Sequence, residues 1–184
     1  IENVYLKKLI PDLHVAIPKT AVIGMNEFDN FLENNNLYDV IFEDKEYNHV
    51  LEAFRTARLS EQLRNNLRKY LQVMTKPLAV RSSGLFEDSL NQPFAGVYST
   101  YLLPNNHPDI ERRLEDVENA IKLVFASIYS PESRAYFNAI DYMIEEEKMA
   151  VIIQEVIGNE HNGRYYPEIS GVAQSYNFYP FSYI

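Results

Sequence analysis

The 184-residue chain contains no cysteine and no tryptophan. Without cysteine it can form neither a disulfide framework nor a thiolate metal site, and it suits the reducing cytoplasm. No apolar run approaches the ~20 residues that a membrane-spanning helix needs, and the first residues lack the basic-then-apolar order of a signal peptide. These absences predict a cytoplasmic protein without a membrane partner.

Basic residues are scarce. The chain has 17 Lys and Arg against 26 Asp and Glu, which gives a formal net charge of -9 and a pI near 4.9. A surface that binds nucleic acid or anionic lipid needs clustered Lys and Arg. We therefore expect no nucleic-acid partner, and any phosphate site must be local.

Common catalytic and metal-binding patterns are also missing. The sequence has no G-x-S-x-G, H-E-x-x-H or Walker A motif. Its histidines (His14, His49, His107 and His161) lack the spacing of metal ligands. Glu145, Glu146 and Glu147 are consecutive, so they do not converge on one ion, and we predict a solvated acidic segment there. No metal ligand is assigned.

The sequence does contain interleaved helical and strand patterns, and its 46% hydrophobic content can close a sizeable core. Apolar periodicity, caps and prolines predict extended segments at 13–23, 77–82, 97–103, 149–157 and 168–175, and helices after residue 26, within 46–74, after Pro108 and from Ser130. This order predicts an α/β or α+β fold with a mixed sheet packed against helices.

The segment from Pro77 to Leu103 carries the strongest chemical signal. An apolar run ends in Arg81-Ser82-Ser83-Gly84, and a second turn at Gly96 is followed by Thr100. Guanidinium and hydroxyl groups donate to phosphate oxygens, and glycine lets backbone N–H groups approach an anion. The segment therefore suits polyphosphate binding. The alternative is an ordinary strand end whose arginine pairs with Glu87 or Asp88, followed by a plain turn.

A second candidate lies at Gln154-Glu155-Val156, where an apolar strand ends. Backbone groups beside an apolar wall can bind the edge of a purine, so this segment could be a hinge against an adenine. The alternative is a polar residue at a fraying strand end.

Taken in order, these segments resemble the N-terminal nucleotide-binding region of the pyruvate phosphate dikinase and phosphoenolpyruvate synthase family. The most specific block is LAVRSSGLFEDSLNQPFAGVYSTYL at 78–102, similar to the family's "aVRSSAxxEDxxxxSFAGxxxTYL". MAVIIQEVIG at 149–158 looks like "mAVxVQxMV", and weaker likenesses at 17–37, 126–137 and 169–177 follow the family's order. The resemblance implies an ATP-grasp-like fold.

It also implies roles for the candidate residues. Arg81 would bind the ATP phosphates and steady charge during transfer, with Gly96 and Thr100 in the loop that covers the phosphates. Ser82 and Ser83 would support the turn after Arg81. Gln154, Glu155 and Val156 would form the adenine-contacting hinge.

The resemblance further implies a larger enzyme. The chain begins at Ile1, and the family's lysine-bearing segment and the carboxylates that hold Mg²⁺ are not found in it. We expect residues 1–184 to be a single partial domain that works with phosphohistidine and pyruvate-binding domains, so that ATP phosphorylates a histidine for transfer to pyruvate. Two alternatives remain. One is another acceptor, such as an antibiotic or a glucan. The other is a non-catalytic regulatory module, which Ser99 permits because the family usually has an acidic residue there.

Overall fold

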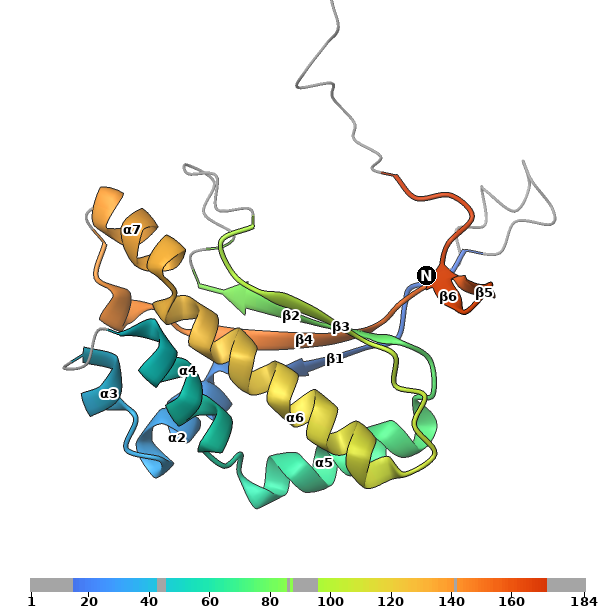
Figure 1. The fold of residues 1–184 in the computed structure, drawn as a ribbon, viewed down its shortest axis with the longest axis horizontal. Helices are drawn as coiled ribbons and strands as arrows, with labels where there is room; N and C mark the ends of the chain where they lie inside the picture. The colour runs from blue at the N-terminus through green and yellow to red at the C-terminus, as the bar shows by residue number, and fades with distance from the viewer. Residues whose placement is uncertain (1–14, 43–45, 86, 88–95, 141, 172–184) are drawn as a thin grey trace, which may run out of the picture.

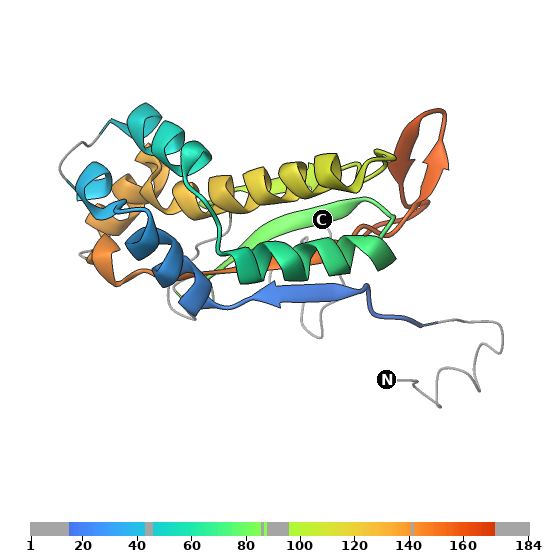
Figure 2. The same ribbon diagram turned by 90° about the horizontal axis from the view of Figure 1, so that it is seen from below.

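The computed structural model describes residues 15–42, 46–85, 87, 96–140 and 142–171. Its centre is a four-stranded sheet with the order β1-β4-β2-β3, and the helices lie along one side of it (Figures 1 and 2). The sheet strands are β1 (Thr20–Ile23), β2 (Leu78–Gly84), β3 (Thr100–Leu103) and β4 (Met149–Glu155). The α-helices are α2 (Met25–Asn34), α3 (Tyr38–Phe42), α4 (Tyr47–Thr56), α5 (Glu61–Val73), α6 (Ile110–Ala126) and α7 (Pro131–Ala139). Short 3₁₀ turns occupy Ser127–Tyr129 and Ile144–Glu146, and β5 (Asn159–His161) pairs with β6 (Arg164–Tyr166).

The described helices cover one side of the sheet, and none of them covers the other side. Along β2, Leu78, Val80, Ser82 and Gly84 are buried, whereas Arg81 between them is exposed. Successive side chains of a strand point to opposite faces, so the buried set faces the helices. The predicted fold class, in which a sheet packs against helices, is confirmed. The sheet was expected to be mixed, but its four described strands pair antiparallel throughout.

Local signals in the sequence explain where several helices begin. The Ser60 Oγ accepts a hydrogen bond of 3.1 Å from the N–H of Leu63 and caps α5. Ser130 caps α7 in the same way, with Pro131 in its first turn. These caps satisfy backbone donors that a helix start otherwise leaves unpaired.

Aromatic rings fill the space between the helices. Phe125 of α6 lies 5.1 Å from Phe28 and 5.5 Å from Phe31 of α2, measured between ring centroids. Phe54 of α4 in turn packs edge-on against Phe31 and Tyr129. This cluster joins α2, α4 and α6 into one core beneath the sheet.

The strands differ from the prediction in extent. The predicted strand at 97–103 begins only at Thr100, because Gly96 to Ser99 form a turn. The described part of the segment predicted at 168–175, residues 168–171, contains no strand, and residues 172–175 lie outside the described residues. None of the described helices is long and apolar enough to cross a bilayer.

The β5–β6 hairpin was not predicted, although the sequence contains its signal. Asn162 and Gly163 join the strands with φ of 53° and 76°. Positive φ at both turn positions is the geometry that Asn-Gly favours in two-residue hairpins. The hairpin folds back on Gly158, where a Cβ would lie 2.5 Å from the carbonyl carbon of Tyr166.

The aromatic core predicts a large cost for truncating its central ring. We expect Phe125→Ala to lower the free energy of unfolding by about 3–5 kcal/mol, because it removes a fully buried ring and leaves a cavity. Val73→Ala is the control, since Val73 is 72% exposed and its truncation should cost less than about 0.5 kcal/mol. Urea unfolding measures both, and equal costs would contradict the proposed position of the core.

Candidate functional site

The uncovered side of the sheet brings together several residues singled out by the sequence. The strand register lines up two rows of side chains in the order β1, β4, β2, β3. One row is Thr20, Gln154, Ala79 and Leu102, and the next is Val22, Ile152, Arg81 and Thr100. We call these two rows, together with Ser83, the open face. No helix among the described residues covers it, and Val22 and Leu102 are 66% and 71% exposed.

Arg81 and Thr100 are direct neighbours on this face. They are paired across β2 and β3, and both are exposed. Directly opposite residues of an antiparallel pair have Cα atoms about 4.5–5.5 Å apart. The guanidinium and the hydroxyl can therefore donate to the same small anion.

The salt bridge between Arg81 and Glu87, which the alternative interpretation of this segment predicted, is not formed. The carboxylate of Glu87 instead accepts hydrogen bonds from the N–H of Gly84 (3.1 Å) and the hydroxyl of Ser82 (3.4 Å). Within the described ranges, Arg81 makes no salt bridge. The other predicted partner, Asp88, lies outside the described residues. Among its described neighbours, the guanidinium is thus not held by a carboxylate.

The two serines after Arg81 point to opposite sides. Ser83 is half-buried and lies on the open face, whereas Ser82 is only 5% exposed and lies on the helix side. Ser82 therefore holds the strand end through Glu87. Ser83 is the serine that a ligand on the open face could reach.

Gly96 adopts a backbone conformation that other residues avoid. Its φ is 84°, and apart from its chain neighbours no described residue has a heavy atom within 4 Å of the place that a Cβ would occupy. Glycine is needed here for its left-handed backbone and not for lack of space. Gly96 begins the turn that leads through Tyr98 to Thr100.

Apolar side chains form the middle of the open face. Ile152 is next to Arg81 on one side and next to Val22 on the other. In the neighbouring row, the Gln154 amide donates to the Thr20 hydroxyl at 3.1 Å. The open face thus has a cation and hydroxyls at one end, an aliphatic surface in the middle and an amide beyond it. The sequence had not indicated Val22, Ala79, Leu102 or Ile152, whose proximity follows only from the register.

The predicted hinge residues lie at the end of β4. The backbone N–H groups of Glu155 and Val156 already donate hydrogen bonds within the fold. The N–H of Glu155 donates to the carbonyl of Lys19, and that of Val156 donates to the carbonyl of Pro77 (both 2.9 Å). The Glu155 carboxylate binds the Lys76 ammonium at 2.8 Å, and this hydrogen bond lowers the pKa of Glu155. The N–H groups and this carboxylate are therefore committed to the fold.

Val156 also borders a cavity of about 610 Å³ between the end of the sheet and the β5–β6 hairpin. Its other walls include Pro77, Leu102, Arg164 and Tyr165. Leu102 connects this cavity with the open face. Of the predicted site residues, only Val156 lines it.

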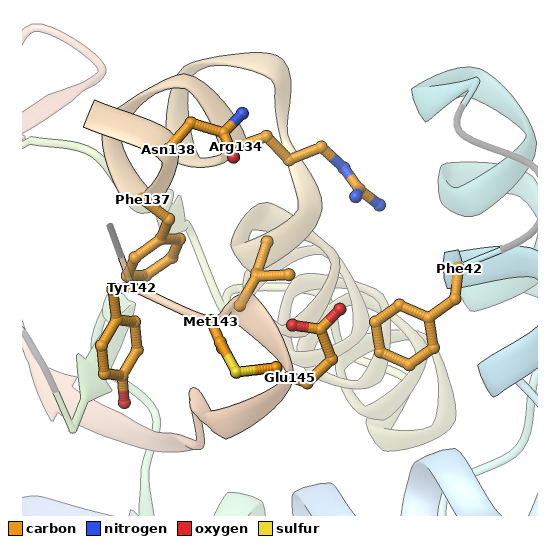
Figure 3. Close-up of a pocket in the computed structure, with 8 residues that line it drawn as sticks. Phe42, Arg134, Phe137, Asn138, Tyr142, Met143 and Glu145 are labelled. Atoms are coloured by element: carbon orange, nitrogen blue, oxygen red, sulfur yellow. The ribbon is translucent and has the colours of Figure 1, made fainter. Parts of the chain in front are cut away.

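A second cavity of about 440 Å³ lies near α7 (Figure 3). It is bordered by Phe42, by residues of α7 that include Arg134, and by the 142–145 segment. The Arg134 guanidinium donates to the carbonyls of Tyr129 (3.0 Å) and Ile41 (2.8 Å), so it holds the fold together. None of the predicted site residues lines this cavity.

The prediction of a solvated acidic segment was wrong for Glu147. Its side chain is buried, with 2% exposure, against Tyr98 and the end of β2. Nothing in the sequence indicated this burial, because three consecutive carboxylates normally indicate a solvated surface.

Among the described residues, no group of three or more His, Asp or Glu side chains is arranged to hold a metal ion. The described residues thus offer no such cluster for the Mg²⁺ that the resemblance implies, and no step below is derived through a metal.

Comparisons with known proteins agree with the sequence resemblance. The family described as the AMP/ATP-binding domain of pyruvate phosphate dikinase matches residues 3–181. A curated relative, the "uncharacterized phosphotransferase YvkC" of Bacillus subtilis (strain 168), is 26% identical over 149 residues. The aligned region covers 81% of this chain and 17% of that relative, so the chain spans less than a fifth of the relative's length. The resemblance inferred from the motifs is confirmed.

Because Gly96 has a positive φ, replacing it with alanine should strain the backbone, whereas the same replacement at a glycine without a positive φ should not. We expect Gly96→Ala to lower the free energy of unfolding by about 1–2 kcal/mol, because alanine is disfavoured in the left-handed region. In the control Gly171→Ala, the new Cβ likewise meets no described residue within 4 Å, but the φ is not positive. This change should stay within about 0.5 kcal/mol. Denaturant unfolding compares the two, and an equal response would show that the φ of Gly96 is not what matters.

Proposed function

Because the chain belongs to the family of the AMP/ATP-binding domain of pyruvate phosphate dikinase, we propose that it binds ATP across the open face. The chain would be the N-terminal nucleotide-binding lobe of a larger dikinase-type phosphotransferase. The observation that carries the proposal is the exposed Arg81 beside Thr100, with an aliphatic surface next to them.

The phosphates belong at the Arg81 end. The guanidinium offers a planar fork of donors to phosphate oxygens, and Thr100 and Ser83 add hydroxyl donors. Phosphoryl transfer depends mainly on positioning and on stabilising charge, so the role of Arg81 is to hold the phosphates and offset their negative charge. The turn at Gly96 covers them.

The nucleoside belongs toward the other end of β4. Ile152, Ala79 and Leu102 offer an aliphatic floor, and Gln154 to Val156 form the hinge beside the base. Since the N–H groups of Glu155 and Val156 are used in the sheet, the hinge would contribute mainly carbonyl oxygens, which suit the exocyclic amine of adenine. Pro77 lies beside Val156, and Arg81 follows it by four residues along extended chain. This distance of about 13 Å suits an extended nucleotide.

The rest of the reaction needs parts beyond the described residues. On this proposal, the full protein transfers phosphate from ATP to a histidine on a swivelling domain and then to pyruvate, and Mg²⁺ is held by residues elsewhere in that protein. The printed name of the Bacillus relative, a phosphotransferase, supports transferase activity in the full protein. The same geometry would serve another acceptor, such as an antibiotic or a glucan. We propose a cytoplasmic location because ATP is available there and the chain has no cysteine that would need an oxidising compartment.

A regulatory module that binds the nucleotide without catalysis is the second candidate. It is favoured by Ser99, which stands where the family usually has an acidic residue and whose N–H is tied to the hydroxyl of Ser127 at 3.2 Å. Both candidates need nucleotide binding, and they differ only in transfer.

Arg81 tests the binding step. We expect Arg81→Ala in the full-length protein to weaken ATP binding about 10- to 100-fold, because a charge-assisted contact worth about 1.5–3 kcal/mol is lost. The melting temperature should hardly change, because Arg81 is exposed and makes no described salt bridge. Calorimetric titration and thermal melting measure the two effects.

Arg112→Ala is the matched control, since Arg112 is an exposed arginine of α6 that pairs with Glu115 at 3.2 Å. It should leave ATP binding unchanged. A large fall in melting temperature for Arg81→Ala with unchanged affinity would instead support a structural ion pair and sink the proposed phosphate role.

Labelled ATP separates the enzyme from the module. Incubation of the full-length protein with ATP labelled in its β or γ phosphate should give an acid-labile phosphoprotein, as expected for phosphohistidine. Arg81→Ala should reduce the labelling at least about tenfold, in proportion to the lost phosphate contact. Tight ATP binding without any labelling would favour the regulatory module.

A further inference from the structure

Two buried side chains meet directly behind the phosphate end of the open face. A Cβ built on Gly84, the last residue of β2, would lie 2.5 Å from the Glu147 Oε1 and 2.6 Å from the Tyr98 Cε2. Both side chains therefore converge on this glycine from other parts of the chain. Any larger residue at position 84 would push one of them away.

Both side chains are withdrawn from water. Glu147 is 2% and Tyr98 is 8% exposed. Burial, together with the charge of the Glu147 carboxylate, raises the pKa of the Tyr98 phenol. Glu87, which holds Gly84 and Ser82, adds to the same effect. A buried carboxylate is costly unless its surroundings are arranged for it, so this contact defines one specific position of the two residues.

The contact joins the three chain segments that carry the proposed phosphate site. Gly84 follows Arg81 by three residues on β2, and Tyr98 precedes Thr100 by two. Glu147 precedes β4, whose first residue Met149 pairs with Gly84. The ends of β2, β3 and β4 are thus fixed against one another at one point.

A second bond holds the same turn. The N–H of Ser99 donates to the Ser127 Oγ at 3.2 Å, and that hydroxyl donates to the carbonyl of Val124 at 2.6 Å. Ser127 is 1% exposed and follows α6 directly. The turn from Gly96 to Thr100 is therefore anchored at two successive residues, at Tyr98 by its side chain and at Ser99 by its bond to the end of α6.

We propose that Glu147 and Tyr98 are positioning residues, which hold the Gly96–Thr100 turn so that Thr100 stays beside Arg81 before the nucleotide arrives. The proposal rests on the proposed function for its ligand but not for its geometry. The turn is then a preformed wall of the site and not a lid that orders on binding. Neither residue touches the nucleotide.

Hydrogen exchange without ligand tests the anchor itself. In the full-length protein, Tyr98→Phe and Glu147→Gln should each speed amide exchange in residues 97–103 about tenfold. This is the change expected when local opening of the turn is opposed by roughly one hydrogen bond less. Gly84→Ala, which displaces both side chains by steric contact, should do the same. Glu118→Gln and Tyr129→Phe are matched controls, because they alter a buried carboxylate and a buried phenol elsewhere in the core. They should leave exchange in 97–103 unchanged, even if they lower the melting temperature.

Nucleotide kinetics then test the positioning. Tyr98→Phe and Glu147→Gln should raise the KM for ATP about tenfold, matching the lost protection of the turn, whereas Glu118→Gln should not. Faster exchange with unchanged KM would overturn the positioning role and leave the two residues merely structural. Unchanged exchange in all three variants would overturn the anchor even if the protein binds ATP. If the unaltered protein binds no ATP, the proposed function fails, and the exchange data still decide whether the anchor exists.

Discussion

The pairing of β2 with β3 on one side and β4 on the other determines where Arg81, Thr100 and Gln154 lie on the open face. Leu78 and Val80 pack against the helices, which turns Arg81 outward. A register slip of one residue would bury the guanidinium and expose both apolar side chains. The packing of the core thus positions the charge at the surface, and no bond to Arg81 itself is required.

The one-sided sheet also explains how an acidic protein can offer a phosphate site. With a net charge of -9 the chain as a whole repels anions, so attraction has to be local. Arg81 provides it because Glu87 is occupied by Gly84 and Ser82. On the same face, Val22 and Leu102 stay exposed although they are apolar. A cation next to an aliphatic surface suits a ligand that is anionic at one end and flat and apolar at the other.

The sequence predicted the parts of this site better than their arrangement. Arg81, Gly96 and Thr100 stood out because their side chains or backbone freedom suit phosphate, and apolar runs located β2 and β4. The contact of Arg81 with Ile152 could not be predicted, because alternation within a strand does not determine which residue lies opposite on the next strand. The burial of Glu147 was missed because it depends on a tertiary contact with Tyr98 and Gly84. The β5–β6 hairpin could have been found from Asn162-Gly163, since that dipeptide favours its turn.

The two buried carboxylates among the described residues illustrate different uses of a costly group. Glu118 accepts a hydrogen bond of 2.6 Å from Arg64 and ties α6 to α5, far from the open face, as a structural ion pair does. Glu147 lies instead where three strand ends meet, next to a phenol and a glycine. An apolar side chain would fill that space at lower electrostatic cost. A carboxylate there makes sense if the exact position of the adjoining turn matters more than stability, and the adjoining turn is the one that carries Thr100.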